Sequence, residues 1–195
     1  MFTGIVEETG KVVALAGKGG AWRLRVRARK AARGLGLGDS VAVNGCCLTV
    51  AAKTRGVLVF DLLEETLRRT DLGALRAGSR VNLERSMKAG GRYGGHFVSG
   101  HIDCAGVVKV LERRGKNFYL RVGFPKKFGG LVVEKGSIAI AGVSLTVAEA
   151  GRTTLAVWLI PHTLAVTNFG ELKVGARVNL EFDLLAKYAE RRIKE

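Results

Sequence analysis

The chain has 195 residues, and its 32 lysines and arginines outnumber its 17 acidic residues to give a formal net charge of +15. Hydrophobic residues make up 47% of the chain, which is enough for a buried core and excludes a disordered polycation. No apolar run approaches the ~20 residues that span a bilayer, and acidic residues come early, so we expect no membrane association and no secretion signal.

Alternating apolar and polar residues predict β-strands along the first half of the chain. The predicted strands are residues 22–29, 40–43, 57–60 and 80–83. In the first of these, apolar side chains share one face and four arginines occupy the other. One or two helical turns are expected after Glu64, before the last strand.

The second half follows the same order after a glycine-rich joint at residues 90–96. Its predicted strands are residues 118–124, 137–140, 155–158 and 177–180. A helical turn is expected after Pro161, and Leu184, Leu185 and Tyr188 form an apolar stripe of helical spacing near the end. This stripe predicts a helix that docks on another surface, such as a second subunit.

The two halves are a tandem duplication at an offset of 97 residues. Residues 45–50 (GCCLTV) match residues 142–147 (GVSLTV), and residues 78–84 (GSRVNLE) match residues 175–181 (GARVNLE). About six short strands per copy favour a small closed barrel. We therefore predict an all-β fold of two tandem six-stranded antiparallel Greek-key barrels with a C-terminal helix. The predicted boundaries are 1–96, 97–183 and 184–195.

The two copies differ in one reactive residue. Cys47 in the first copy corresponds to Ser144 in the second, and each is followed two residues later by a threonine on the same strand face. Taken alone, these residues are also typical of strand and core positions. No acid or base adjoins them in sequence, so a hydrolase triad is not indicated. Two similar pockets with different reactive groups would suit the binding of one compound twice, in different roles.

Metal and nucleic-acid sites are not indicated. His96 and His101 would lie on opposite faces of a strand, which is poor geometry for binding one ion with Cys104, and structural histidines are the alternative. The arginines of residues 23–29 lack interleaved aromatic residues, so we expect a solvated strand face and no specific nucleic-acid partner. Three cysteines without a C-x-x-C pair predict free thiols and a cytoplasmic location.

Taken together, these motifs resemble the lumazine-binding repeat family over essentially the whole chain. The segments that carry the resemblance are residues 1–8 (MFTGIVEE), 43–50 (VNGCCLTV), 94–103 (GGHFVSGHID), 136–147 (GSIAIAGVSLTV), 160–164 (IPHTL) and 178–188 (VNLEFDLLAKY). Any one of them is weak evidence, but the ordered set is specific.

The resemblance implies an enzyme that catalyses a dismutation without a redox cofactor or metal. Two molecules of 6,7-dimethyl-8-ribityllumazine, both bound at one site, exchange a four-carbon unit to yield riboflavin and 5-amino-6-ribitylaminouracil. Holding both molecules in contact supplies much of the rate. The resemblance also implies a homotrimer joined by the C-terminal helices, in which the first barrel of one subunit faces the second barrel of a neighbour.

The family pattern divides the expected substrate contacts into two groups. The first group is Gly4, Ile5, Val6, Cys47, Leu48, Thr49, Asp61, Leu62, Leu63, Glu64, Glu65 and Thr66. The second group is Gly100, His101, Ile102, Lys135, Ser144, Leu145, Thr146, Ile160, Pro161, His162, Thr163, Leu164 and Ala165.

The expected mechanism begins with loss of a proton from the acidic C7 methyl group of the donor, whose anion attacks the acceptor. His101 is the favoured proton-transfer group because histidine ordinarily titrates near neutrality. Cys47 and Ser144 are each expected to add to or orient one ring, and Phe2 is expected to close the site. One departure from the family is Ala141, where an aspartate is usual. A carboxylate there could aid catalysis, so a non-catalytic lumazine- or flavin-binding protein is the alternative.

Overall fold

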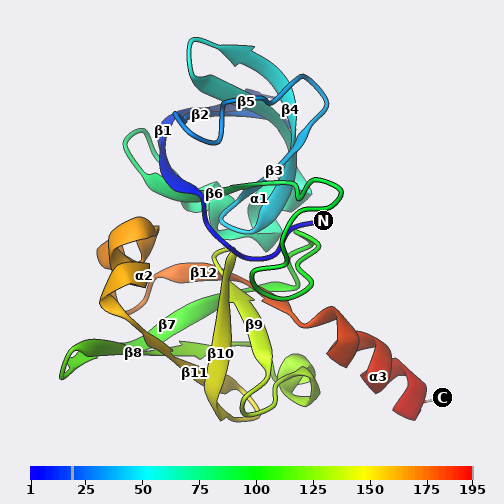
Figure 1. Cartoon of the computed structure of the whole chain (residues 1–195), viewed down its shortest axis with the longest axis vertical. Helices are drawn as coiled ribbons and strands as arrows, with labels where there is room; N and C mark the ends of the chain where they lie inside the picture. The colour runs from blue at the N-terminus through cyan, green and yellow to red at the C-terminus, as the bar shows by residue number, and fades with distance from the viewer. Residues whose placement is uncertain (19, 195) are drawn as a thin grey trace.

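The computed structural model describes residues 1–18 and 20–194 and shows two β-barrels, one above the other (Figure 1). The chain builds the upper barrel first, then the lower barrel, and ends in helix α3 (Leu184–Lys194), which projects away from both (Figure 1). Residue 195, the last of the predicted tail, lies outside the described residues. No helix in the described part of the chain is long and apolar enough to cross a membrane. The predicted fold of two six-stranded barrels with a C-terminal helix is confirmed.

Six antiparallel strands close the first barrel. They are β1 (Glu8–Lys18), β2 (Ala21–Arg27), β3 (Ser40–Val43), β4 (Cys46–Thr54), β5 (Val57–Leu63) and β6 (Arg80–Arg85). Their order around the barrel is β1-β2-β5-β4-β3-β6, with β6 pairing back to β1. Because β2 pairs with β5 and not with β3, the connectivity is that of a Greek key. Helix α1 (Glu64–Arg69) and the 3-10 helix η1 (Asp71–Ala74) connect β5 to β6.

The second barrel repeats this arrangement strand for strand. Its strands are β7 (Cys104–Arg114), β8 (Asn117–Gly123), β9 (Ser137–Ile140), β10 (Val143–Ala150), β11 (Thr154–Leu159) and β12 (Arg177–Phe182). Their order is β7-β8-β11-β10-β9-β12, which is the first order with β7 in place of β1. The connections hold the 3-10 helices η2 (Lys126–Leu131) and η3 (Asn168–Glu171) and helix α2 (Pro161–Val166).

Each barrel is filled by its own hydrophobic core. The alternation in β2 places Leu24 and Val26 in the first core while the arginines of the strand face solvent. In β8, Leu120 and Val122 are likewise fully buried in the second core. Burying one face of each strand is the main source of stability for such a barrel, so the polar outer face is free to carry a site.

Two departures from the predicted elements occur where chain segments leave regular pairing. Strands β1 and β7 were not predicted, and of β4 and β10 only the short stretches at Cys47 and Ser144 were. Each of these four strands carries a β-bulge. A bulge interrupts the period-2 pattern on which the prediction relied. The strand assumed to hold both His96 and His101 is not formed, because this segment crosses between the barrels and, among the described residues, is paired only by the bridge of Val98 to Phe2.

The two barrels meet where two tight turns touch. Asn44-Gly45 joins β3 to β4, and Ala141-Gly142 joins β9 to β10. All four residues have positive φ, at 47°, 81°, 46° and 77°, as a two-residue hairpin turn requires. A Cβ atom on Gly45 would lie 2.8 Å from the backbone nitrogen of Gly142, so glycine is needed for this contact. We call this region the junction.

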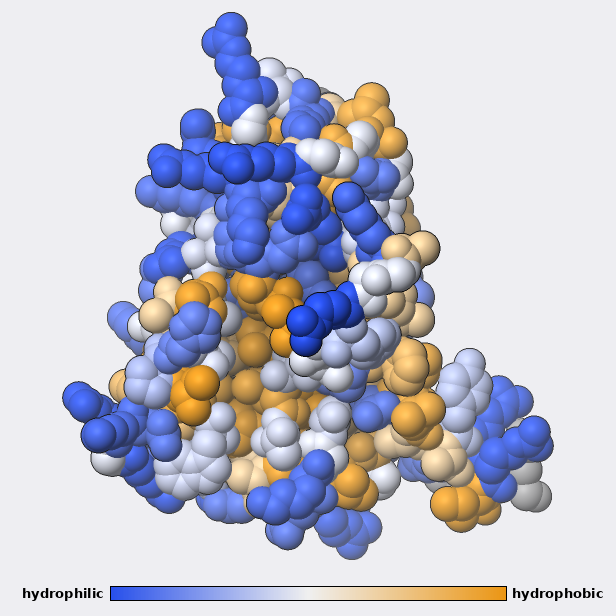
Figure 2. Space-filling view, in the orientation of Figure 1, coloured by the Kyte–Doolittle hydropathy of each residue, from blue (hydrophilic) through white to orange (hydrophobic). Residues whose placement is uncertain are grey.

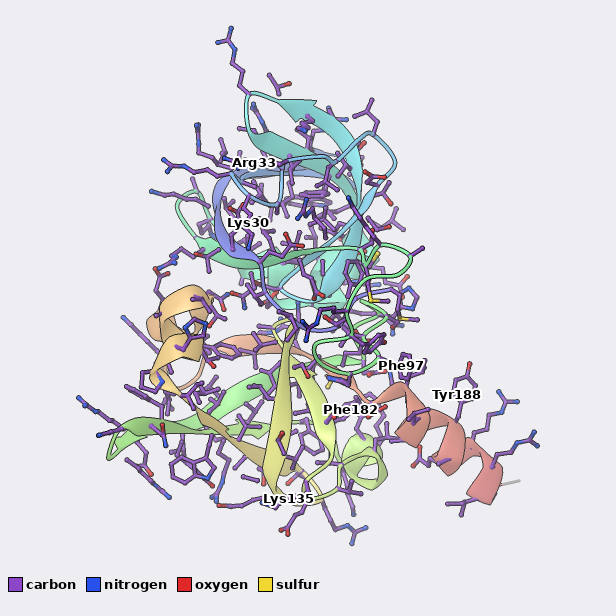
Figure 3. All side chains as sticks on the ribbon, in the orientation of Figure 1. Lys30, Arg33, Phe97, Lys135, Phe182 and Tyr188 are labelled. Atoms are coloured by element: carbon purple, nitrogen blue, oxygen red, sulfur yellow. The ribbon has the colours of Figure 1, made fainter. Side chains whose placement is uncertain are left out.

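Helix α3 presents one apolar face that the chain leaves uncovered. Lys187 of α3 forms an ion pair with Asp103, with its Nζ atom 2.6 Å from Oδ2, which fastens the helix to the second barrel. Leu185 and Tyr188 are 63% and 66% exposed. Hydrophobic side chains gather on the face near the junction and along α3 (Figure 2), and Phe97 and Tyr188 lie on the same side of the molecule (Figure 3).

Candidate active site

Each barrel carries a cavity on its outer face, beside the strand that follows the junction turn. The first pocket, of about 250 Å³, is lined mainly by Cys47, Leu48, Leu63, Thr66, Gly100 and His101. The second pocket, of about 340 Å³, is lined mainly by Lys135, Ser144, Leu145, Thr146, Ile160 and Thr163. Four of these positions in each pocket are equivalent in the duplication, so the two pockets share one plan.

The position of each junction turn places a reactive side chain, Cys47 or Ser144, on the outer face of its barrel. In β4, Cys46 points into the core and is 7% exposed, and the next residue, Cys47, faces the first pocket. In β10, Val143 points into the core in the same way and Ser144 faces the second pocket. Because successive strand residues point to opposite faces, the turn position decides which residue reaches the pocket.

A segment that begins in the other repeat lies against the pocket-facing strand of each barrel. The backbone N–H of Cys47 donates to the carbonyl of Gly100 at 2.8 Å, and that of Ser144 donates to the carbonyl of Gly4 at 2.8 Å. Residues 100–102 therefore cover the first barrel, and residues 4–6 cover the second.

The expected grouping of contacts was therefore wrong on this point. It placed residues 4–6 with Cys47 and residues 100–102 with Ser144, whereas the structure pairs them the other way. The physical reason is the antiparallel bridge between Phe2 and Val98 at the junction. After this bridge, each segment continues across to the opposite barrel, so Val6 packs on the second core and Ile102 on the first.

Two buried glutamates anchor the crossing segments. Glu84 accepts hydrogen bonds from the backbone N–H groups of Thr3 and Gly4 at 2.8 and 3.0 Å. Glu181 accepts the equivalent bonds from Ser99 and Gly100 at 2.6 and 2.9 Å. Burial raises the pKa of Glu84, while these donors lower it. Sequence reasoning missed both glutamates, although each ends the duplicated Val-Asn-Leu-Glu motif.

The cysteine candidates have different environments. Cys47 is half-buried and borders the first pocket. Burial raises the pKa of the Cys46 and Cys104 thiols to about 12, so neither is a thiolate near neutral pH. Phe2 does not reach a pocket as expected, because it is fully buried at the junction, where it packs in one cluster with Cys47.

One histidine lines the first pocket, and another contacts the reactive residue of the second. His101 is exposed and lines the first pocket, beside Cys47. The Nδ1 atom of His96 lies 2.7 Å from Oγ of Ser144 at the second pocket. His96 is buried, and desolvation lowers its pKa, so its ring favours the neutral form. The sequence indicated only a structural histidine here, and no motif near His96 identified Ser144 as its partner.

Several expected contact residues lie away from the pockets. Leu62 is 4% exposed and belongs to the first core, so it cannot contact a ligand. Asp61 pairs with Arg23, with Oδ1 and Nε 2.7 Å apart. The expected residues that do not border either pocket are Gly4, Ile5, Val6, Thr49, Glu64, Pro161, His162, Leu164 and Ala165.

Ala141 lies in the junction and not in a pocket. It is 1% exposed, and its carbonyl accepts a hydrogen bond from the Asn82 side chain at 2.9 Å. Its first-repeat equivalent, Asn44, hydrogen-bonds to the buried carboxylate of Asp71 at 2.9 Å. Ala141 therefore lies at the contact between the barrels and is not among the described residues that line either pocket.

A larger cavity lies elsewhere, and none of the reactive candidates lines it. It has about 610 Å³ and lies between the N-terminal segment and the residues after β6. Its wall includes the ion pair of Glu7 and Arg85, but no cysteine or histidine. In the described part of the chain, no three histidine, cysteine or acidic side chains are placed to hold a metal ion.

Comparisons with known proteins point to one family. The sequence pattern of the lumazine binding domain matches the chain twice, over residues 3–86 and 99–183. Riboflavin synthase of Mycobacterium tuberculosis (strain ATCC 25618 / H37Rv) is 46% identical over 197 residues, which cover 98% of this chain and 97% of that protein. Riboflavin synthase of Actinobacillus pleuropneumoniae is 44% identical over 190 residues, which cover 97% and 88%.

The fold also matches a solved structure of LumP complexed with riboflavin. The TM-score is 0.87 at 26% identity, and the match covers 93% of this chain and 99% of that chain. The identity to the synthases is therefore considerably higher than the identity to LumP.

Proposed function

The chain belongs to the lumazine-binding domain family and has the activity of a riboflavin synthase, and we propose that its two kinds of pocket hold the two lumazine molecules consumed in this reaction. The transferase moves a four-carbon unit from one 6,7-dimethyl-8-ribityllumazine to another. The products are riboflavin and 5-amino-6-ribitylaminouracil. Binding both reactants in fixed orientation supplies much of the rate, because it makes the encounter effectively unimolecular.

The observation that carries this proposal is the equivalence of the two pockets. Each adjoins a hairpin turn and a strand against which a crossing segment, held by a buried glutamate, is bonded, and each is lined by a threonine from a short helix, Thr66 or Thr163. A reaction whose donor and acceptor are the same compound needs two such sites. The difference between Cys47 and Ser144 then lets the two molecules take different roles.

In the first pocket, Cys47 orients the bound ring and His101 transfers the methyl proton. The half-buried thiol and the exposed imidazole border the same cavity. Histidine suits the transfer because its two protonation states are both populated near neutral pH.

In the second pocket, Ser144 orients the ring and His96 holds Ser144. Because burial favours the neutral imidazole, Nδ1 can accept the Ser144 hydroxyl proton across the 2.7 Å contact. The Nε2 atom of His96 is buried without a hydrogen-bond partner among the described residues. A neutral ring tolerates this position better than an imidazolium would.

The chain divides into an N-terminal lumazine-binding barrel at 1–96, a C-terminal lumazine-binding barrel at 97–183 and an oligomerisation helix at 184–195. We infer a homotrimer in which the first pocket of one subunit faces the second pocket of its neighbour. Exposed Leu185 and Tyr188 on α3 support an interface there. The unpaired cysteines support a reducing, cytoplasmic location.

Activity is tested by incubating the purified chain with 6,7-dimethyl-8-ribityllumazine and following riboflavin fluorescence. We expect product from the wild type and slower turnover from Cys47→Ser and His101→Gln. Unchanged turnover in a variant would remove that residue from its role. Lumazine binding without product would favour a binding protein.

The facing of pockets from different subunits is tested by complementation. Cys47→Ser impairs only first pockets and Ser144→Ala only second pockets, so a mixed assembly contains some sites with both pockets intact. We expect mixing, after dissociation and reassembly, to restore part of the lost activity. If the mixture is no more active than the average of its components, each site lies within one subunit.

A further inference from the structure

The two barrels differ along one row of outward-facing side chains. In the second barrel, Trp158 of β11 lies opposite Tyr119 of β8, with ring centroids 5.4 Å apart at an interplanar angle of 69°. In the first barrel, Asp61 of β5 lies opposite Arg23 of β2, and the two form an ion pair. The same place in the fold therefore holds an aromatic pair in one repeat and an ionic pair in the other.

Trp158 is a wall of the second pocket. It lines the cavity with Ser144 and Thr146, and 44% of it is exposed. In the first pocket, no phenylalanine, tyrosine or tryptophan is among the described lining residues. The ionic pair at Asp61 lies outside that cavity, so the first pocket has no flat apolar surface to replace the indole.

The indole is held in place from behind. Tyr119 is 1% exposed and packs edge-on against Trp158. The guanidinium of Arg114 lies 4.2 Å from the centroid of Tyr119 and 5.9 Å from that of Trp158, within the range of cation–π attraction. The indole of Trp158 is therefore packed on one side and exposed on the other, so its exposed face can stack on a planar ligand.

We propose that Trp158 determines ligand recognition in the second pocket by stacking on the flat fused-ring system of the bound lumazine or flavin. This assignment rests on the proposed function, since it takes the planar ligand from there. It makes the two pockets unequal: one ring is bound by aromatic stacking, and the other by Cys47, His101 and the crossing segment alone. The substitution of Trp158 should therefore affect one of the two bound molecules.

Equilibrium dialysis of the full chain with riboflavin measures the number of sites and the affinity of each. In Trp158→Leu, we expect one site to weaken about tenfold or more, the usual scale for losing a ring-stacking partner, while the other keeps its affinity. Trp158→Phe retains a smaller flat ring and should recover most of the lost affinity. This recovery separates stacking from a general disturbance of the strand.

Trp22, the only other tryptophan in the chain, provides a matched control. It lies on β2, packs against the first core and lines neither pocket. Trp22→Phe should leave both affinities unchanged. In that variant all tryptophan emission comes from Trp158, and we expect quenching to follow the filling of the site that Trp158→Leu weakens.

The possible results separate this assignment from the proposed function. Two sites of wild-type affinity in Trp158→Leu would overturn the role of Trp158 while leaving the synthase proposal intact. Equal weakening of both sites would also overturn it, because the indole would then act through the overall fold. A wild-type chain that binds neither riboflavin nor the lumazine would overturn the proposed function and the assignment together.

Discussion

Replacing Gly100 with alanine should damage the first pocket and leave the second in place. Gly100 has φ +85°, and an added Cβ atom would lie 2.5 Å from Cβ of Cys47. The left-handed backbone costs alanine about 1–2 kcal/mol, and forcing a methyl group into this packed contact costs about 1–3 kcal/mol. The free energy of unfolding should therefore fall by about 2–5 kcal/mol, and Tm by about 4–20 °C, at ~2–4 °C per kcal/mol.

Gly175→Ala separates the backbone cost from the packing cost. Gly175 has φ +89°, but no heavy atom lies within 4 Å of the position of its added Cβ atom. Scanning calorimetry should give Gly175→Ala only the smaller shift, and riboflavin titration should find one weakened site in Gly100→Ala alone. If both variants unfold at the same temperature and both keep two intact sites, residue 100 is not tightly packed against Cys47. That result would refute the predicted packing cost.

Three further predictions concern stability. Ala141→Asn should raise the free energy of unfolding by about 1 kcal/mol, because asparagine tolerates a φ of +46° better than alanine does; a lower Tm in thermal denaturation would contradict this. Burial raises the pKa of Asp71 from 3.8 to about 7, so protonation favours the folded state, and stability should fall as pH rises from about 4 to 7. Urea unfolding of Asp71→Asn should lack this slope, and parallel pH profiles would count against the assignment. Arg23→Ala should leave the free energy of unfolding almost unchanged, because its ion pair with Asp61 is more than half exposed; a clear loss of stability in urea unfolding would show that the pair has a further role.

The strands and the duplication could be predicted because each depends on local pattern. Residues 22–29 and 118–124 alternate clearly, since one face of each strand fills a core. The bulged strands β1 and β7 were missed because the extra residue shifts the alternation halfway along. The alternating pattern reflects which side chains are buried. It does not predict a strand where backbone pairing becomes irregular.

The composition of each pocket could not be predicted from the sequence alone. The duplication shows that residues 4–6 and 100–102 are equivalent, but equivalence does not say which barrel each one covers. That depends on the bridge between Phe2 and Val98, a contact between residues far apart in the sequence. The contact of His96 with Ser144 was missed for the same reason, since 48 residues separate them.

The duplicated scaffold carries acid–base groups that are themselves not duplicated. His101 borders the first pocket, whereas its equivalent in the first repeat is Ile5, and His96 contacts Ser144 in the second repeat. Both histidines therefore come from one segment, the linker of residues 96–101 between the barrels. This linker contributes to both pockets because it lies at the junction, where a single short segment can reach both barrels. A duplication that kept strict symmetry would bind two lumazines in equal roles, while the reaction requires one to give a four-carbon unit and the other to receive it. The departures from symmetry at the linker, at Cys47 and Ser144, and at Trp158 are thus where we locate the choice between donor and acceptor.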